Sequence, residues 1–118
     1  MASEDEFRVG DVVTDAKGAA VPALIVEVLD KTAEEYVVSS SASGARITLT
    51  DRYDHVPPTD PVYVLVFDPQ LRRAYPDWQT DQHRAAIAAY RTGSFRSAAR
   101  MRPKSLLTRI NVDSETGL

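Results

Sequence analysis

One stretch of the chain limits the possible folds more than any other. Residues 62–67 read Val-Tyr-Val-Leu-Val-Phe, so six consecutive side chains are apolar. Successive side chains of a strand point to opposite faces, and this run therefore needs a strand that is buried on both sides of a sheet. Pro61 precedes the run, and the pair Asp68-Pro69 ends it. We expect residues 62–67 to form the most central strand.

Strand patterns also occupy most of the chain before this run. In residues 46–50, Ile47 and Leu49 alternate with polar side chains, as in an antiparallel strand with one wet face. Polar or proline-rich segments that predict turns separate the strands, and the serine-rich residues 39–44 are one of them. The expected strands are residues 7–13, 23–29, 36–39, 46–50 and 62–67. Because no helix lies between them, they predict an antiparallel meander.

A helical pattern follows the last of these strands. Thr80 can cap a helix over residues 81–91, and Gly93 suits the exit of that helix. Ile87 and Tyr90 fall on one face at helical spacing, so we expect both side chains to pack on the sheet.

The sequence beyond this helix is less regular. Residues 94–101 favour the start of a second short helix, but Arg102-Pro103 must interrupt it, because the residue before a proline avoids helical backbone angles. Residues 106–110 contain three more apolar side chains and fit either a helical turn or an edge strand.

The expected fold class is therefore α+β, in a single domain over residues 1–118. We expect residues 7–68 to form a small five-stranded antiparallel barrel of the SH3-like kind or a curled sheet, followed by a C-terminal helix. A flat sheet covered by a helix is the alternative. Residues 69–110 are the helical and basic part. Disorder is expected for residues 1–6 and fraying for residues 111–118.

The residue inventory excludes several chemistries. The chain has no cysteine, so disulfides, thiolate zinc sites and cysteine nucleophiles are impossible. It also lacks the Gly-x-Ser-x-Gly elbow of serine hydrolases and the glycine-rich loops that hold nucleotide phosphates. With only two histidines, an enzyme is not expected, and neither is a cofactor.

Two clusters could still bind a ligand. Oxygen and imidazole ligands come together in sequence at Asp51, Asp54, His55 and Asp60, but their spacing matches no metal motif, so a polar turn is favoured and no metal site is expected. Aromatic side chains at Tyr53, Tyr63, Tyr75 and Trp78 could line a ligand patch. Such stripes are more often core, and we expect Trp78 to close one end of the sheet.

Charge is distributed unevenly along the chain. Residues 1–68 carry 5 basic and 13 acidic side chains, whereas residues 69–118 carry 9 basic and 4 acidic ones, within a total of −3. The planar guanidinium group binds two phosphate oxygens at once, so the basic part suits nucleic acid. The candidate phosphate contacts are Arg84, Arg91, Arg96, Arg100, Arg102 and Lys104. The opposite charges could equally pair across the fold or between subunits.

Two stretches together resemble a known group of proteins. Residues 7–13 read Phe-Arg-Val-Gly-Asp-Val-Val, and the valine-rich run from Pro61 is followed by Leu71, Tyr75-Pro76 and Trp78. This combination resembles short proteins of halophilic archaea that pair a Val-Gly-Asp opening with a valine-rich strand and a Tyr-Pro-x-Trp segment. The resemblance covers about the first 80 residues. It implies no catalytic residue, and eleven arginines against three lysines agree with such a source.

We therefore expect a non-enzymatic protein-interaction or oligomerisation module that binds a protein partner or a second copy of itself. Nucleic-acid binding through the arginine-rich last third is the alternative. The longest apolar run, residues 19–26, is far shorter than the roughly 20 residues of a membrane helix, so no membrane contact is expected. The acidic start lacks the apolar segment of a signal peptide, which predicts a cytoplasmic protein.

Overall fold

A computed structural model describes residues 7–16, 21–40 and 42–110 of the chain. The expected disorder of residues 1–6 and fraying of residues 111–118 lie outside the described residues. The strands are β1 (Val12–Asp15), β2 (Ala23–Thr32), β3 (Val37–Ser40), β4 (Arg46–Thr48), β5 (Pro61–Phe67), β6 (Arg100–Pro103) and β7 (Leu107–Arg109). The helices are α1 (Leu49–Arg52), α2 (Asp68–Ala74), α3 (His83–Arg91) and the 3₁₀ turn η1 (Lys104–Leu106).

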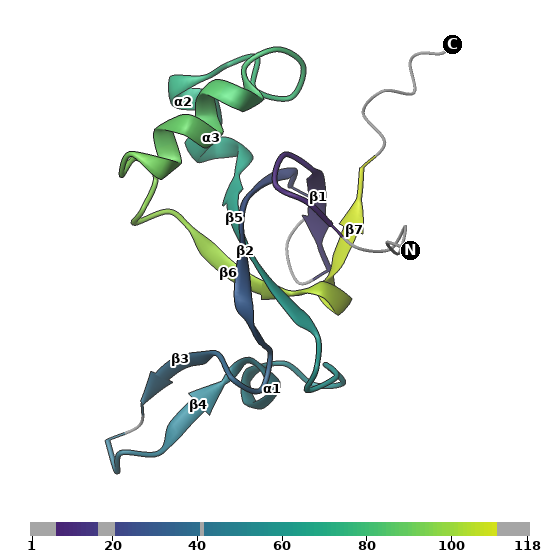
Figure 1. The fold of residues 1–118 in the computed structure, drawn as a ribbon, viewed down its shortest axis with the longest axis vertical. Helices are drawn as coiled ribbons and strands as arrows, with labels where there is room; N and C mark the ends of the chain where they lie inside the picture. The colour runs from purple at the N-terminus through teal and green to yellow at the C-terminus, as the bar shows by residue number, and fades with distance from the viewer. Residues whose placement is uncertain (1–6, 17–20, 41, 111–118) are drawn as a thin grey trace.

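The strands form two antiparallel sheets. Five of them hydrogen-bond in the order β6-β5-β2-β1-β7, and β3 pairs with β4 in a separate hairpin. In Figure 1, α2 and α3 lie together at one end of the molecule, and the hairpin and α1 lie at the other end. The five-stranded sheet lies between these two ends. The prediction of an α+β fold with a five-stranded antiparallel sheet is thus confirmed.

The strands of this sheet are not the five that the sequence predicted. Only β1, β2 and β5 come from residues 7–68, and the remaining two, β6 and β7, follow α3. The helix expected over residues 81–91 is present as α3, but it does not follow the whole sheet, because β6 and β7 come after it in the chain. The second short helix was expected to stop at Arg102-Pro103, and in the structure these two residues belong to β6. Pro103 is compatible with this strand because β6 lies at an edge of the sheet.

The sheet is curled. In a flat sheet, β6 and β1 would lie three strand spacings apart, about 14 Å, which is further than an arginine and an aspartate can span. Yet Arg102 Nε on β6 lies 2.7 Å from Asp15 Oδ2 on β1. In the described residues β6 and β7 do not pair with each other, although only η1 separates them in the chain, so the barrel does not close.

The apolar run over residues 62–67 lies in β5 and is buried on both faces of the sheet, as predicted. Val64 and Val66 of β5 pack with residues of α2 and α3 on the outer face, where Trp78 is fully buried. Tyr63 and Leu65 point to the inside of the curl, among Ile25 and other residues of a second cluster. The middle position of the sheet belongs to β2, however, and β5 lies beside it.

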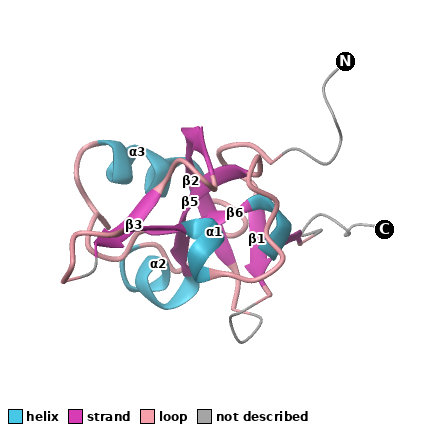
Figure 2. Cartoon of the chain, turned by 90° about the horizontal axis from the view of Figure 1, so that it is seen from below, coloured by secondary structure: helices cyan, strands magenta, loops and turns pink. Residues whose placement is uncertain are grey.

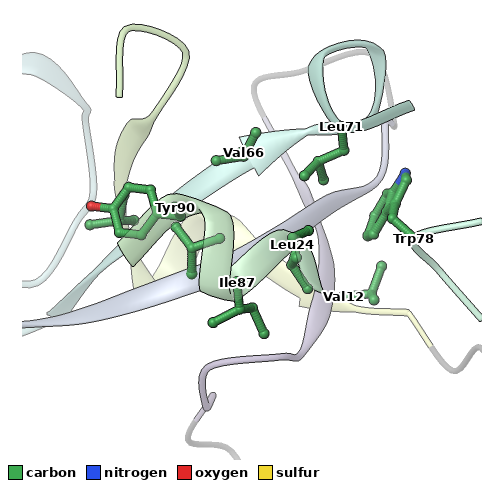
Figure 3. Close-up of a cluster of buried hydrophobic side chains, with 10 residues drawn as sticks. Val12, Leu24, Val66, Leu71, Trp78, Ile87 and Tyr90 are labelled. Atoms are coloured by element: carbon green, nitrogen blue, oxygen red, sulfur yellow. The ribbon is translucent and has the colours of Figure 1, made fainter. Parts of the chain in front are cut away.

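The outer cluster holds the helices on the sheet. Ile87 and Tyr90 of α3 are buried against it, as the helical spacing predicts, and Figure 3 shows them beside Leu24 and Val66. Trp78 donates its Nε1 hydrogen to Asp68 Oδ1 at 2.9 Å. This bond links the segment between α2 and α3 to the first residue of α2.

The hairpin and α1 form the other end of the molecule, nearest the viewer in Figure 2. The predicted strand over residues 46–50 ends early, because Thr48 caps α1 and its backbone N–H donates to Asp51 Oδ2 at 2.9 Å. Leu49 then packs with Val56 and Val62 in a third buried cluster. None of the helices in the described part of the chain could span a membrane.

Candidate functional site

A groove lies between β6 and the segment that contains β3 and α1. Its volume is about 280 Å³. Among the described residues, three arginines and two tyrosines line it together with four apolar residues, and we call it the Arg–Tyr groove. The lining residues are Tyr36, Val38, Leu49, Arg52, Tyr53, Ala99, Arg100, Met101 and Arg102.

Short elements place the polar side chains of the groove. The single turn of α1 ends at Arg52, and Tyr53 is its C-cap residue. On the opposite wall, Arg100 and Arg102 are two residues apart on β6 and therefore share one face of the strand. Tyr36 comes directly before β3. The site thus combines residues from both halves of the chain.

Hydrogen bonds orient the two arginines of β6. Arg100 Nη1 donates to the backbone oxygens of Ser97 at 3.0 Å and Ala99 at 2.9 Å. Arg102 Nη1 donates to Met101 O at 2.9 Å. The Arg102 guanidinium carbon also lies 5.9 Å from the centroid of the Tyr53 ring, within cation–π range.

The groove carries excess positive charge. Asp15, only 3% exposed, offsets the charge of Arg102. Arg52 and Arg100 are exposed, and neither belongs to an ion pair among the described residues. The carboxylate of Asp51, although next to Arg52 in sequence, accepts the backbone N–H of Thr48. Two guanidinium groups that have no carboxylate partner among the described residues, beside partly exposed tyrosine rings, can bind an anionic ligand with a flat group.

The six residues predicted from the sequence do not share one surface. Arg100 and Arg102 lie in the Arg–Tyr groove, whereas Arg84 is exposed on α3. Lys104 lines a separate hollow with Phe7, Asp60, Ser105 and Leu107. The remaining two, Arg91 and Arg96, lie in a third hollow beside Tyr90.

Acidic and aromatic groups occupy this third hollow. The guanidinium carbon of Arg96 lies 4.9 Å from the centroid of the Tyr90 ring. The Tyr90 hydroxyl donates to Glu27 Oε1 at 2.7 Å. Burial and this carboxylate raise the pKa of Tyr90 to about 12. The charge of Glu27 makes this hollow less suited to an anion than the Arg–Tyr groove.

Sequence reasoning missed Arg52 and Tyr36. Both belong to the acidic part of the chain, and the prediction considered phosphate contacts only in the basic part. One local signal was present, because Arg52 and Tyr53 place a cation next to an aromatic ring, one helical turn after the capping residue Thr48.

The structure also separates the two other sequence clusters. Trp78 and Tyr63 are buried in different clusters, while Tyr53 lies in the groove, so the four aromatic residues form no common patch. Across residues 7–16, 21–40 and 42–110, no three His, Asp or Glu side chains gather as metal ligands would. Asp60 instead accepts the backbone N–H of Ser105 at 2.7 Å.

Comparisons with protein-family models, curated proteins and solved structures gave no match. The function is therefore argued from the site itself.

Proposed function

We propose that the protein is a non-enzymatic interaction module that holds an anionic segment of a partner in the Arg–Tyr groove. The observation that supports this most directly is that Arg52 and Arg100 face one apolar and aromatic groove from opposite walls without a carboxylate partner in the described chain. Guanidinium groups in such a setting form strong, charge-assisted hydrogen bonds with anions.

The lining of the groove supports a binding rather than a catalytic role. Among the described residues that line it, none is a histidine, a carboxylate, a lysine or a serine. Arginine stays protonated at all ordinary pH values, so it cannot act as a general base. Orienting and binding a ligand is what these side chains do best.

We also propose that the curled sheet is an open barrel of the SH3-like kind. Two features support this: the order β6-β5-β2-β1-β7, and the single 3₁₀ turn that joins the two edge strands. The β3–β4 hairpin and α1 then form an insertion between two barrel strands, and the insertion supplies one wall of the groove.

The test is a double charge reversal, Arg52→Glu with Arg100→Glu, in the full chain. The probes are a polyglutamate peptide, a single-stranded oligonucleotide and an uncharged peptide. We expect at least one anionic probe to bind, and each reversal to weaken its binding by about tenfold, as for the loss of a charge-assisted hydrogen bond.

Arg73→Glu is the matched control, because Arg73 is exposed on α2 and lies outside the groove. It should bind the probe as the unmodified protein does, and circular dichroism should show the same fold for all variants. Equal binding by the double variant, or no binding of either anionic probe, would overturn the proposal.

A further inference from the structure

The groove's walls point to one class of anion. Resting on the proposed function above, we infer that the Arg–Tyr groove binds single-stranded nucleic acid, with a base against the Tyr36 and Tyr53 rings and phosphates on Arg52 and Arg100. Two observations favour this partner over an acidic peptide: the state of the β6 edge and the chemistry of the groove.

The first observation concerns the edge strand. An extended peptide that joins a sheet needs free backbone donors and acceptors along an edge. The backbone oxygen of Ala99, just before β6, and that of Met101 on β6 already accept hydrogen bonds from the neighbouring Arg100 and Arg102 side chains, and Pro103 has no N–H. β5 pairs with one side of β6, and in the described residues no strand pairs with its other side.

This arrangement protects the edge against strand addition. Natural sheets block exposed edges with charged side chains and with proline, and β6 carries both. Recognition in the groove must therefore come from side chains rather than from a backbone ladder.

The second observation concerns those side chains. Aromatic rings stack on bases without regard to base identity, and guanidinium groups bind the phosphates on either side. Tyr36 and Tyr53 are both partly exposed, while Leu49 and Met101 provide an apolar floor. A groove of about 280 Å³ is near the lower end of the size of small-ligand sites, so it suits one nucleotide unit at a time.

A base can enter this groove only when it is unpaired. The bases of a duplex are stacked and paired, and proteins that read them on aromatic rings bind single strands. Hydrogen bonds already hold the Arg100 and Arg102 side chains in place. Binding therefore costs these side chains less conformational entropy.

The test uses fluorescence anisotropy with labelled single strands of about ten nucleotides. RNA and DNA of the same sequence, the matching duplex and polyglutamate are compared on the full chain at about 50 mM and about 200 mM salt. We expect the single strands to bind at least about tenfold more tightly than the duplex and polyglutamate. Tighter binding of RNA than of DNA would indicate a contact between the protein and the 2′-hydroxyl. Equal binding of the two would indicate contacts with base and phosphate only. Both outcomes support the inference.

The variants separate stacking from charge. Tyr53→Leu should weaken binding by about tenfold, and Tyr36→Leu repeats the test on the other ring. Tyr53→Phe keeps the ring and should bind more tightly than Tyr53→Leu. Arg52→Glu should make the slope of log K against log salt shallower by about one unit, because it removes a phosphate contact. Arg84→Glu, on α3 and outside the groove, should change neither affinity nor slope.

A measurement on the unmodified protein keeps the test independent of how the variants fold. When a single strand that contains iodouridine is photo-crosslinked to the protein, it should become attached to Tyr36 or Tyr53. Attachment at the α3 surface instead would overturn the inference. Preferred binding of polyglutamate, weakened by Arg52→Glu, would overturn the nucleic-acid inference but leave the proposed function standing. Failure of every anionic probe would overturn both.

Discussion

At the scale of single residues, arginine has several roles in this chain, and the surroundings decide which. Arg102 pairs with the buried Asp15, and Arg72 pairs with Asp68 one helical turn away on α2. Arg96 lies over an aromatic ring. Arg52, in contrast, faces a groove without a carboxylate partner in the described part of the chain. The residue type alone therefore does not identify a ligand contact.

Tyr90 offers a pH-dependent test at this scale. Its pKa is raised from 10 to about 12, first by burial and then by the Glu27 carboxylate that accepts a hydrogen bond from its hydroxyl. A raised pKa means that the fold favours the neutral phenol. This contribution to the free energy of unfolding is complete below pH 10 and is lost as the pH rises toward about 12.

The Tyr90→Phe variant should therefore be less stable than the parent at neutral pH by about 1 kcal/mol, the usual net value of a hydrogen bond. The difference should shrink between pH 10 and about 12. Urea unfolding of both proteins across that range measures it. Tyr75→Phe is the control, because Tyr75 contacts Phe95 through its ring. A Tyr90 difference that stays constant with pH would contradict the expectation.

At the scale of elements, local sequence patterns explain where helices stop. α3 ends before Gly93, whose φ of +114° lies in the region that glycine adopts and other residues avoid. The turn there directs the chain away from the α3 axis toward β6. A β-carbon built at Gly93 would meet nothing within 4 Å, so only the backbone angle requires glycine.

Gly93→Ala should consequently lower the free energy of unfolding by about 1 to 2 kcal/mol through backbone strain. Gly93→Asn should cost less, since asparagine tolerates positive φ better than alanine. Thermal unfolding followed by circular dichroism compares the two. An alanine variant as stable as the parent would show that the turn after α3 is not fixed by this residue.

At the scale of the whole molecule, the final strand completes the sheet. β7 pairs with β1 although nearly the whole chain lies between them, and its Leu107 is buried inside the curl. Arg109 adds an ion pair to Asp11 at 2.9 Å. Together with Arg102 and Asp15, these contacts join the C-terminal strands to the first strand.

Leu107→Ala should therefore destabilise the whole sheet, by about 2 to 5 kcal/mol, as for other buried leucines. Thr108→Ala, one residue further and exposed on the other face, should change stability by no more than about 0.5 kcal/mol. Denaturant unfolding monitored by far-ultraviolet circular dichroism measures both. Similar stabilities for the two variants would mean that β7 is not part of the cooperative core.

The sequence by itself determined the elements with long or strongly patterned apolar faces. Residues 23–29 and 62–67 are strands, and residues 83–91 form the helix whose Ile87 and Tyr90 pack on the sheet. Burial requires a period of about 2 in a strand and 3.6 in a helix, so these patterns are visible without a structure.

Only the tertiary structure decided which segments meet. β6 and β7 have four and three residues, too few to show a period, and their strand state depends on the hydrogen bonds of β5 and β1. The Arg–Tyr groove likewise depends on the approach of α1 to β6, which no local pattern encodes. The sequence shows that positive charge is concentrated in the last third of the chain. Only the tertiary structure shows that Arg100 and Arg102 from this part line the groove together with Arg52 from the acidic part.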